Sequence, residues 1–154
     1  MTFLERVCAA FEAAELRYAL VGGHAVALHG AVRGTVDIDY VINWSLRTLA
    51  LAEGALNKLG LESRLPIRAE DVFHYRDEYI SNRNLLAWSF YNPKDLSEQV
   101  DILINYDLRG KKTDVFKVRG QQVRVIGREE LIKMKLASGR PQDLEDVAAL
   151  ERLK

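Results

Sequence analysis

The sequence lacks the features that mark several large classes of protein. Its one cysteine, Cys8, falls within an expected amphipathic helix and is interpreted as a core residue rather than a redox group. Such sparse cysteine usage suits a reducing compartment. No signal peptide or long apolar segment is present, so we expect a cytoplasmic protein with no membrane partner. Lys and Arg total 22, as do Asp and Glu, so no overall basic charge indicates a nucleic-acid binder.

The 154 residues show no internal repeat, low-complexity tract or linker, and we expect one domain spanning 1–154. Apolar periodicity and capping signals predict a mixture of helices and strands. The expected fold class is therefore α+β, a mixed β-sheet flanked by helices. Helices are expected over 3–16, directly after 22–23, over 46–59, 68–82 and 131–138 and from Pro141 onward, and strands over 18–21, 36–42, 85–91, 100–105, 114–118 and 122–126.

A glycine pair comes directly after the first expected strand. The apolar run 18–21 leads into Gly22 and Gly23, and a short helix is expected next. Glycine accepts unusual backbone angles and lets another group approach the main chain closely. The N–H groups at the start of the helix then offer a site for phosphate oxygens. A Gly-Gly pair is also common in plain turns, so its meaning depends on the residues that come after it.

Two aspartates share one face of the next expected strand. Alternation over 36–42 places Asp37 and Asp39 on the face opposite to the apolar side chains. Two ionised carboxylates at such a short distance repel each other unless a cation lies between them. Magnesium, which bridges carboxylates and substrate phosphates, meets that need. An exposed strand edge or a loop entry is the alternative for either aspartate alone.

A third aspartate, Asp101, lies in the apolar run 100–104. A charge is rarely placed in such a run without a partner. If its strand lies beside the strand of Asp39, three carboxylates converge on one site. The alternative is a strand edge at which Asp101 pairs with a lysine.

The last two expected helices carry further charged candidates. At about 100° per residue, Leu131, Ile132, Met134 and Leu136 form a broad apolar face with Lys135 near its centre, while Lys133 points away. An inward lysine needs a partner or a purpose, unless it reaches back to solvent. In the next helix Leu144 is expected to face inward, Asp143 lies at the edge of that face, and Asp146 lies further round. Acids in a first turn can also simply favour the helix dipole, which is the alternative for Asp143.

The glycine pair, the stretch Arg33-Gly34-Thr35-Val36-Asp37-Ile38-Asp39 and the later Val100-Asp101-Ile102 resemble the DNA polymerase beta-like nucleotidyltransferase superfamily. Within it, the tail from Arg128 to Asp146 resembles the abortive-infection toxin type, which has a lysine-bearing helix, then an arginine and an Asp-x-x-Asp helix. The superfamily often has Gly-Ser where this chain has Gly22-Gly23. In this interpretation Arg33 or Thr35 compensates for the missing serine hydroxyl.

The resemblance implies a metal-dependent nucleotidyltransferase that moves a nucleoside monophosphate from a nucleoside triphosphate to an acceptor hydroxyl. Asp37, Asp39 and Asp101 would then be catalytic residues that hold two Mg²⁺ ions, and Lys135 and Asp143 would be secondary catalytic residues. Gly22, Gly23, His24, Arg33 and Thr35 are the expected nucleotide-binding residues, His24 on its position alone.

The resemblance leaves the acceptor open. A toxin-like enzyme implies RNA or a protein as acceptor and an antitoxin as partner. The alternatives are an aminoglycoside- or lincosamide-type small-molecule enzyme and a nucleotide-binding module that has lost activity. The other histidines, His29 and His74, and the tryptophans, Trp44 and Trp88, are expected to be ordinary packing or surface residues.

Overall fold

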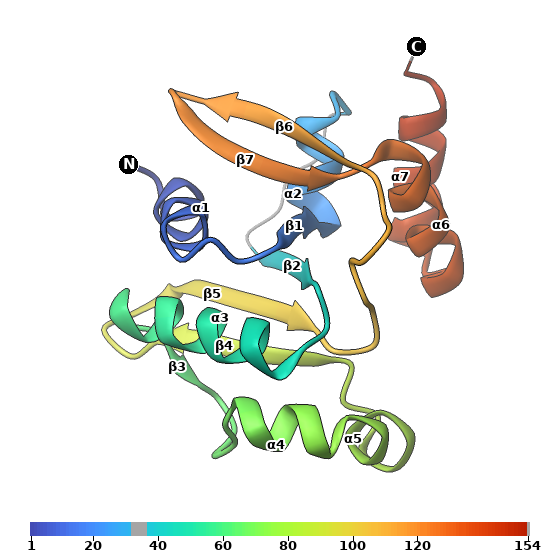
Figure 1. The fold of residues 1–154 in the computed structure, drawn as a ribbon. Coiled ribbons are helices and arrows are strands. Elements are labelled where there is room, and N and C mark those ends of the chain that lie inside the picture. The colour runs from blue at the N-terminus through green and yellow to red at the C-terminus, as the bar shows by residue number, and fades with distance from the viewer. Residues whose placement is uncertain (32–36, 154) are drawn as a thin grey trace.

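The computed structural model describes residues 1–31 and 37–153. Seven strands form one sheet in the order β3-β4-β5-β2-β1-β7-β6, and helices flank it (Figure 1). The strands are β1 (Tyr18–Val21), β2 (Ile38–Ile42), β3 (Glu62–Ser63), β4 (Ala87–Asn92), β5 (Asp95–Leu103), β6 (Thr113–Val118) and β7 (Gln121–Ile126). The helices are α1 (Phe3–Ala13), α2 (Gly22–Leu28), α3 (Leu46–Lys58), α4 (Ala69–His74), α5 (Arg76–Arg83), α6 (Arg128–Ser138) and α7 (Pro141–Glu151).

The sheet is mixed. β1 pairs antiparallel with β2 and parallel with β7, while β2 pairs parallel with β5. The antiparallel pairs β4–β5 and β6–β7 extend the sheet on its two sides. The expected α+β class with a mixed sheet is therefore confirmed.

One face of the sheet is sealed by α1 and α3. Phe11 on α1 packs edge-on against Tyr18 and Tyr40, with ring centroids 5.3 and 5.0 Å away. Cys8, also on α1, is buried, and its Sγ lies 3.2 Å from the Tyr40 hydroxyl. Burial raises the pKa of Cys8 to about 11. A thiol held protonated in the core fits the packing role expected of it.

Three strands alternate between a buried and a more open face. Where β2, β4 and β5 pair with one another at the centre of the sheet, the even-numbered residues are buried, among them Tyr40, Trp88 and Ile102. The neighbouring odd-numbered residues Asp39, Ser89 and Asp101 are only half-buried. This period of two places the polar side chains of the sheet on the face that α1 and α3 leave uncovered.

One expected helix is in fact two. The chain leaves helical geometry at Tyr75, where φ is −106° and ψ is 19°. The Tyr75 N–H closes α4 on the Asp71 carbonyl, and the Tyr75 carbonyl accepts the Tyr79 N–H that opens α5. The single helix predicted over 68–82 was wrong because no proline or glycine marks this break.

Other boundaries also differ from the prediction. β5 begins at Asp95, five residues before the predicted start, because the β4–β5 hairpin extends past the core, where apolar alternation gives no signal. The two-residue β3 was not predicted. α1 ends at Ala13, before Glu15 adopts a left-handed φ of 57°. Within the described ranges, no helix is both long and apolar enough to cross a bilayer.

Candidate active site

The site begins where β1 ends and the chain turns into α2. Gly22 has a φ of +70°, which glycine adopts easily and other residues rarely adopt. A Cβ atom on Gly22 would overlap the Oδ2 atom of Asp39. The glycine therefore allows the backbone at the start of α2 to lie directly against a carboxylate of β2.

Strand pairing aligns two carboxylates. Asp39 on β2 lies opposite Val21 on one side and opposite Asp101 on the other. β5 is an inner strand between β2 and β4, so the alternative of a strand edge for Asp101 was wrong. Asp37 directly precedes β2 and is exposed.

These carboxylates influence one another. Burial raises the pKa of Asp39 to about 6, and the charges of Asp101 and Asp37 raise it as well, while the charge of Lys135 opposes them. Hydrogen bonding with the Asp101 carboxyl raises the pKa of Asp39 further, because one of two carboxyl groups must carry a proton to donate. The positive charge near Asp39 and Asp101 therefore does not balance their negative charge.

A cavity of about 430 Å³ opens over this pair. Gly22 and Gly23 line it together with six charged side chains: Asp37, Asp39, Asp101, Lys135, Arg140 and Asp143. The structure therefore brings together seven of the predicted site residues from five separate parts of the chain, and adds Arg140. Their roles in catalysis stay predictions.

The arrangement of the carboxylates bears on the binding of divalent ions. Within residues 1–31 and 37–153, no group of three or more His, Cys, Asp or Glu side chains is arranged to hold a metal ion. The predicted three-carboxylate metal site therefore stays a prediction. The adjacent Asp39 and Asp101 carboxyls, whose mutual repulsion a cation would relieve, still have the chemistry that Mg²⁺ requires.

Helices α6 and α7 close one side of the cavity with an ionic network. The Lys135 Nζ atom lies 3.3 Å from Asp143 Oδ1 and 3.0 Å from Asp146 Oδ2. Asp143 also accepts hydrogen bonds from the Arg140 side chain at 2.8 Å and from the Arg140 N–H at 3.1 Å. Burial alone would raise the pKa of Asp143, but Arg140 and Lys135 hold it below its ordinary value. Asp143 thus caps the N-terminus of α7, in line with the alternative role in the first turn of the helix, and it also pairs with Lys135.

The phase of these two helices was predicted only in part. Lys135 is buried and Lys133 is exposed, as expected. Leu136 and Leu144 were expected to face inward, yet they are 53% and 50% exposed. Asp146 was expected further round the helix, but it is buried against Lys135. The α6–α7 pair can bury these charged side chains because Lys135, Asp143 and Asp146 neutralise one another's charges.

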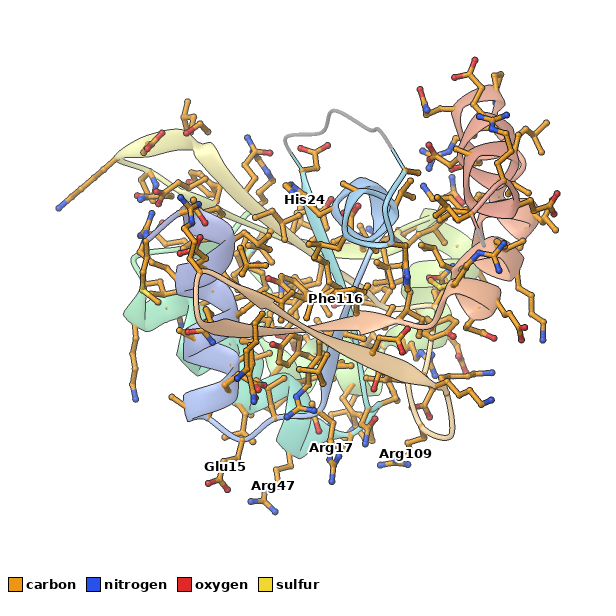
Figure 2. All side chains as sticks on the ribbon, turned by 90° about the horizontal axis from the view of Figure 1, so that it is seen from above. Glu15, Arg17, His24, Arg47, Arg109 and Phe116 are labelled. Carbon is orange, nitrogen blue, oxygen red and sulfur yellow. The ribbon has the colours of Figure 1, made fainter. Side chains whose placement is uncertain are left out.

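The remaining nucleotide-binding candidates are less well placed. His24 is half-buried on α2, on the opposite side of the molecule from Arg17 and Arg47 (Figure 2), and the cavity lining does not include it among the described residues. Arg33 and Thr35 lie outside the described residues.

The other two histidines match the packing and surface roles expected of them. The Nε2 atom of His29 lies 2.7 Å from the Ile126 carbonyl oxygen, and the ring meets Phe116 edge-on. His74 is exposed.

Sequence reasoning missed some cavity residues as individual candidates. Arg140, Asn105 and Ser138 line the cavity but were not selected. Arg140 had a usable signal, since it stands directly before Pro141 and three residues before Asp143, where a capping box forms. Asn105 follows the end of β5, and Ser138 is the last residue of α6. Neither position has a distinctive sequence pattern.

Comparison with solved structures shows the same fold in proteins of low sequence identity. An antigenic nucleotidyltransferase-like protein from Paracoccidioides brasiliensis aligns with a TM-score of 0.61 and 18% identity, over 96% of this chain and 72% of that one. The antibiotic-resistance factor ANT(2'')-Ia aligns with a TM-score of 0.64 and 14% identity, over 96% and 80%. The lincosamide antibiotic adenylyltransferase LnuA aligns with a TM-score of 0.59 and 13% identity, over 94% and 91%.

Sequence comparison is more direct. No curated protein matches the chain. A family model described as "Nucleotidyltransferase of unknown function (DUF6036)" matches residues 4–153, and so covers the glycine pair, the three aspartates and the α6–α7 network. The chain belongs to this DUF6036 family of nucleotidyltransferases.

Proposed function

We propose that this nucleotidyltransferase moves a nucleoside monophosphate from a nucleoside triphosphate to an acceptor hydroxyl in a metal-dependent reaction. The observation that carries the proposal is the alignment of Asp39 with Asp101 beside the glycine turn. A phosphate-binding backbone and a pair of carboxylates then face the same cavity.

The position of each residue in the cavity suggests its role. The N–H groups that open α2 bind the β and γ phosphates, since Gly22 and Gly23 leave the backbone accessible. Asp37, Asp39 and Asp101 would hold two Mg²⁺ ions, and these ions would neutralise phosphate charge and lower the pKa of the acceptor hydroxyl. Asp101 lies on the side of the pair away from the glycines, which favours a role for it on the acceptor side.

The chemical step is an in-line displacement. The acceptor oxygen forms a bond to the α-phosphorus, the bond from that phosphorus to the bridging oxygen breaks, and pyrophosphate leaves while the hydroxyl proton passes to solvent. The protein mainly positions the reactants and stabilises charge. Arg140 and Lys135, at the edge of the cavity, place positive charge near Asp39.

For the acceptor we propose RNA or a protein, as the toxin-like tail of the sequence implies, with an antitoxin as partner and action in the cytoplasm. A second candidate is a small-molecule acceptor, because two proteins of the same fold are an antibiotic-resistance factor and a lincosamide adenylyltransferase. A module that only binds nucleotides is less favoured because the aspartates and the glycine pair all line one cavity.

The direct test uses triphosphates labelled on the α-phosphate. The protein is incubated with each nucleotide, MgCl₂ and either total RNA, a protein extract or a panel of aminoglycosides and lincosamides. We expect label on one acceptor class and no label with EDTA or with the Asp39→Asn variant. If no nucleotide labels any acceptor and no pyrophosphate is released, the proposed function is wrong.

A further inference from the structure

One face of the sheet beyond Asp101 is open. The buried residues of β4 and β5 pack toward α1 and α3, and their neighbours on the other face, including Ser89 and Gln99, are only half-buried. In the described part of the chain, α2 makes its main contacts on that side with β1, β2 and β7, and α6 and α7 make theirs with each other and with α2, so none of these helices packs extensively against β4 or β5. The open face begins at the cavity and runs outward to the strand edge at β3.

Strand register places polar groups in line across this face. Asp39 pairs with Asp101, and Asp101 pairs with Ser89 on β4. The Arg64 N–H, just after β3, donates to the Ser89 carbonyl at 2.9 Å, which continues the line by one strand. With strands about 4.8 Å apart, Arg64 begins roughly 10 Å from Asp101. A row thus runs from the carboxylate pair to an arginine.

The outer end of this row carries an aromatic platform. The Arg64 guanidinium lies 5.0 Å from the centroid of the Tyr91 ring. Tyr91 pairs with Gln99, two residues before Asp101, so its ring belongs to the same open face. Among the described residues no carboxylate pairs with Arg64 within 4 Å, so the positive charge remains available to a ligand. A tyrosine ring with an adjacent guanidinium stacks nucleobases and attracts phosphates.

We propose that this open face, with Ser89, Tyr91 and Arg64, binds the 3′ end of a single-stranded RNA acceptor. The inference rests on the proposed nucleotidyl transfer and names its acceptor. The terminal ribose hydroxyl lies at Asp101, Ser89 faces the sugar, a base stacks on Tyr91, and Arg64 contacts the backbone phosphate. The order of groups along the row matches the order of groups along a nucleotide chain.

Charge and position favour RNA over the other acceptors. Aminoglycosides are polycationic, and Arg64 would repel them from the outer end of the row. Exposed arginines at Arg17, Arg47 and Arg109 lie together on the side of the molecule opposite to His24 (Figure 2). Arg17 precedes the start of β1, whereas Asp39 pairs with Val21 at the end of that strand. These arginines therefore lie outside the row that runs from Asp101 to Arg64.

The first test measures binding without catalysis. A fluorescein-labelled single-stranded RNA of twelve nucleotides is titrated with the whole protein, and anisotropy gives the dissociation constant at several salt concentrations. We expect Tyr91→Leu to weaken binding at least about five-fold, the lower end for one base–aromatic stack. Arg64→Gln should weaken binding and reduce the slope of log affinity against log salt by about 0.7, as expected for one lost phosphate contact on a single strand.

Arg47→Gln is the matched control, since it removes one exposed arginine from the side of the molecule opposite to His24 (Figure 2), outside the row of polar groups. It should change neither the affinity nor the slope. Equal weakening by Arg47→Gln and Arg64→Gln, equal affinity for DNA of the same sequence, or no RNA binding by the native protein would overturn the proposal.

The second test separates this inference from the proposed function. With labelled nucleotide, MgCl₂ and the same RNA, the native protein should label the RNA 3′ end, and Tyr91→Leu and Arg64→Gln should raise KM for RNA at least about five-fold with a smaller change in kcat. Transfer to a small molecule or a protein but not to RNA would overturn the RNA assignment and leave nucleotidyl transfer intact. Specific RNA binding with no transfer to any acceptor would instead refute the proposed function.

Discussion

At the residue scale, Asp39 is the carboxyl group of the site whose ionised form burial and its neighbours disfavour, and it is also the best candidate metal ligand. Burial and two neighbouring carboxylates raise its pKa to about 6. Its pKa is therefore higher in the folded than in the unfolded protein. The protonated form stabilises the fold fully below the unfolded pKa near 3.8, and this stabilisation is lost as the pH rises through about 6.

Asp39→Asn should therefore stabilise the metal-free protein at pH 8 while abolishing transfer. The amide carries no charge at any pH, so the melting temperature in EDTA should rise by about 2–4 °C for each kcal/mol of repulsion relieved. At pH 4 the difference should nearly vanish. Thermal unfolding at both pH values measures the first effect and labelled-nucleotide transfer the second. A variant less stable than the native protein at pH 8 would contradict this account of Asp39.

Lys135→Met should lower both stability and turnover, whereas Lys133→Met should change neither. The buried Lys135 ammonium lies between Asp143 and Asp146, and removing one member of a buried ion pair costs about 3–5 kcal/mol. Transfer should fall as well, because the network lines the cavity. Denaturant unfolding and transfer rates of both variants provide the measurement. Equal effects of the two substitutions would refute the distinction between these lysines.

At the scale of the element, the β1–α2–β2 unit depends on one glycine. Gly22→Ala would force a left-handed φ on a residue with a side chain, at about 1–2 kcal/mol, and its Cβ atom would overlap Asp39. We expect a lower melting temperature and loss of transfer.

The matched control is Gly54→Ala in the middle of α3, where a Cβ meets no atom within 4 Å. It should stabilise the protein by up to about 1 kcal/mol and leave transfer unchanged. Native activity in Gly22→Ala would mean that the close approach to Asp39 is not needed.

The same unit shows what the sequence could predict. Local signals were enough for β1, α2, the alternation of β2 and the inward Lys135, because periodicity and glycine chemistry act over a few residues. Strand pairing is not local, so the alignment of Asp101 with Asp39 was a condition of the prediction rather than a result of it. The break at Tyr75, the exposure of Leu136 and Leu144, and the burial of Asp146 depend on which neighbours pack against each helix, and no local pattern encodes that.

At the scale of the whole molecule, α1 connects the two sides of the sheet. Glu5 pairs with Arg119 at 2.8 Å and Glu12 with Arg124 at 3.0 Å, both on the β6–β7 hairpin. Arg6 on the same helix pairs with Glu98 of β5. Central β1 and β2 join these sides through continuous backbone pairing. We therefore propose that residues 1–154 form one domain.

A single domain should unfold as one cooperative unit, and the two tryptophans allow a direct test. Trp44 and Trp88 lie in or beside β2 and β4, so their fluorescence reports on only one side of the sheet. Far-ultraviolet circular dichroism also reports on α6 and α7, beyond the other side. Because α1 and the sheet connect both regions, urea should give the same midpoint with both probes. Two separate midpoints would show that the β2–β5 side and the α6–α7 side unfold independently, and would overturn the single-domain proposal.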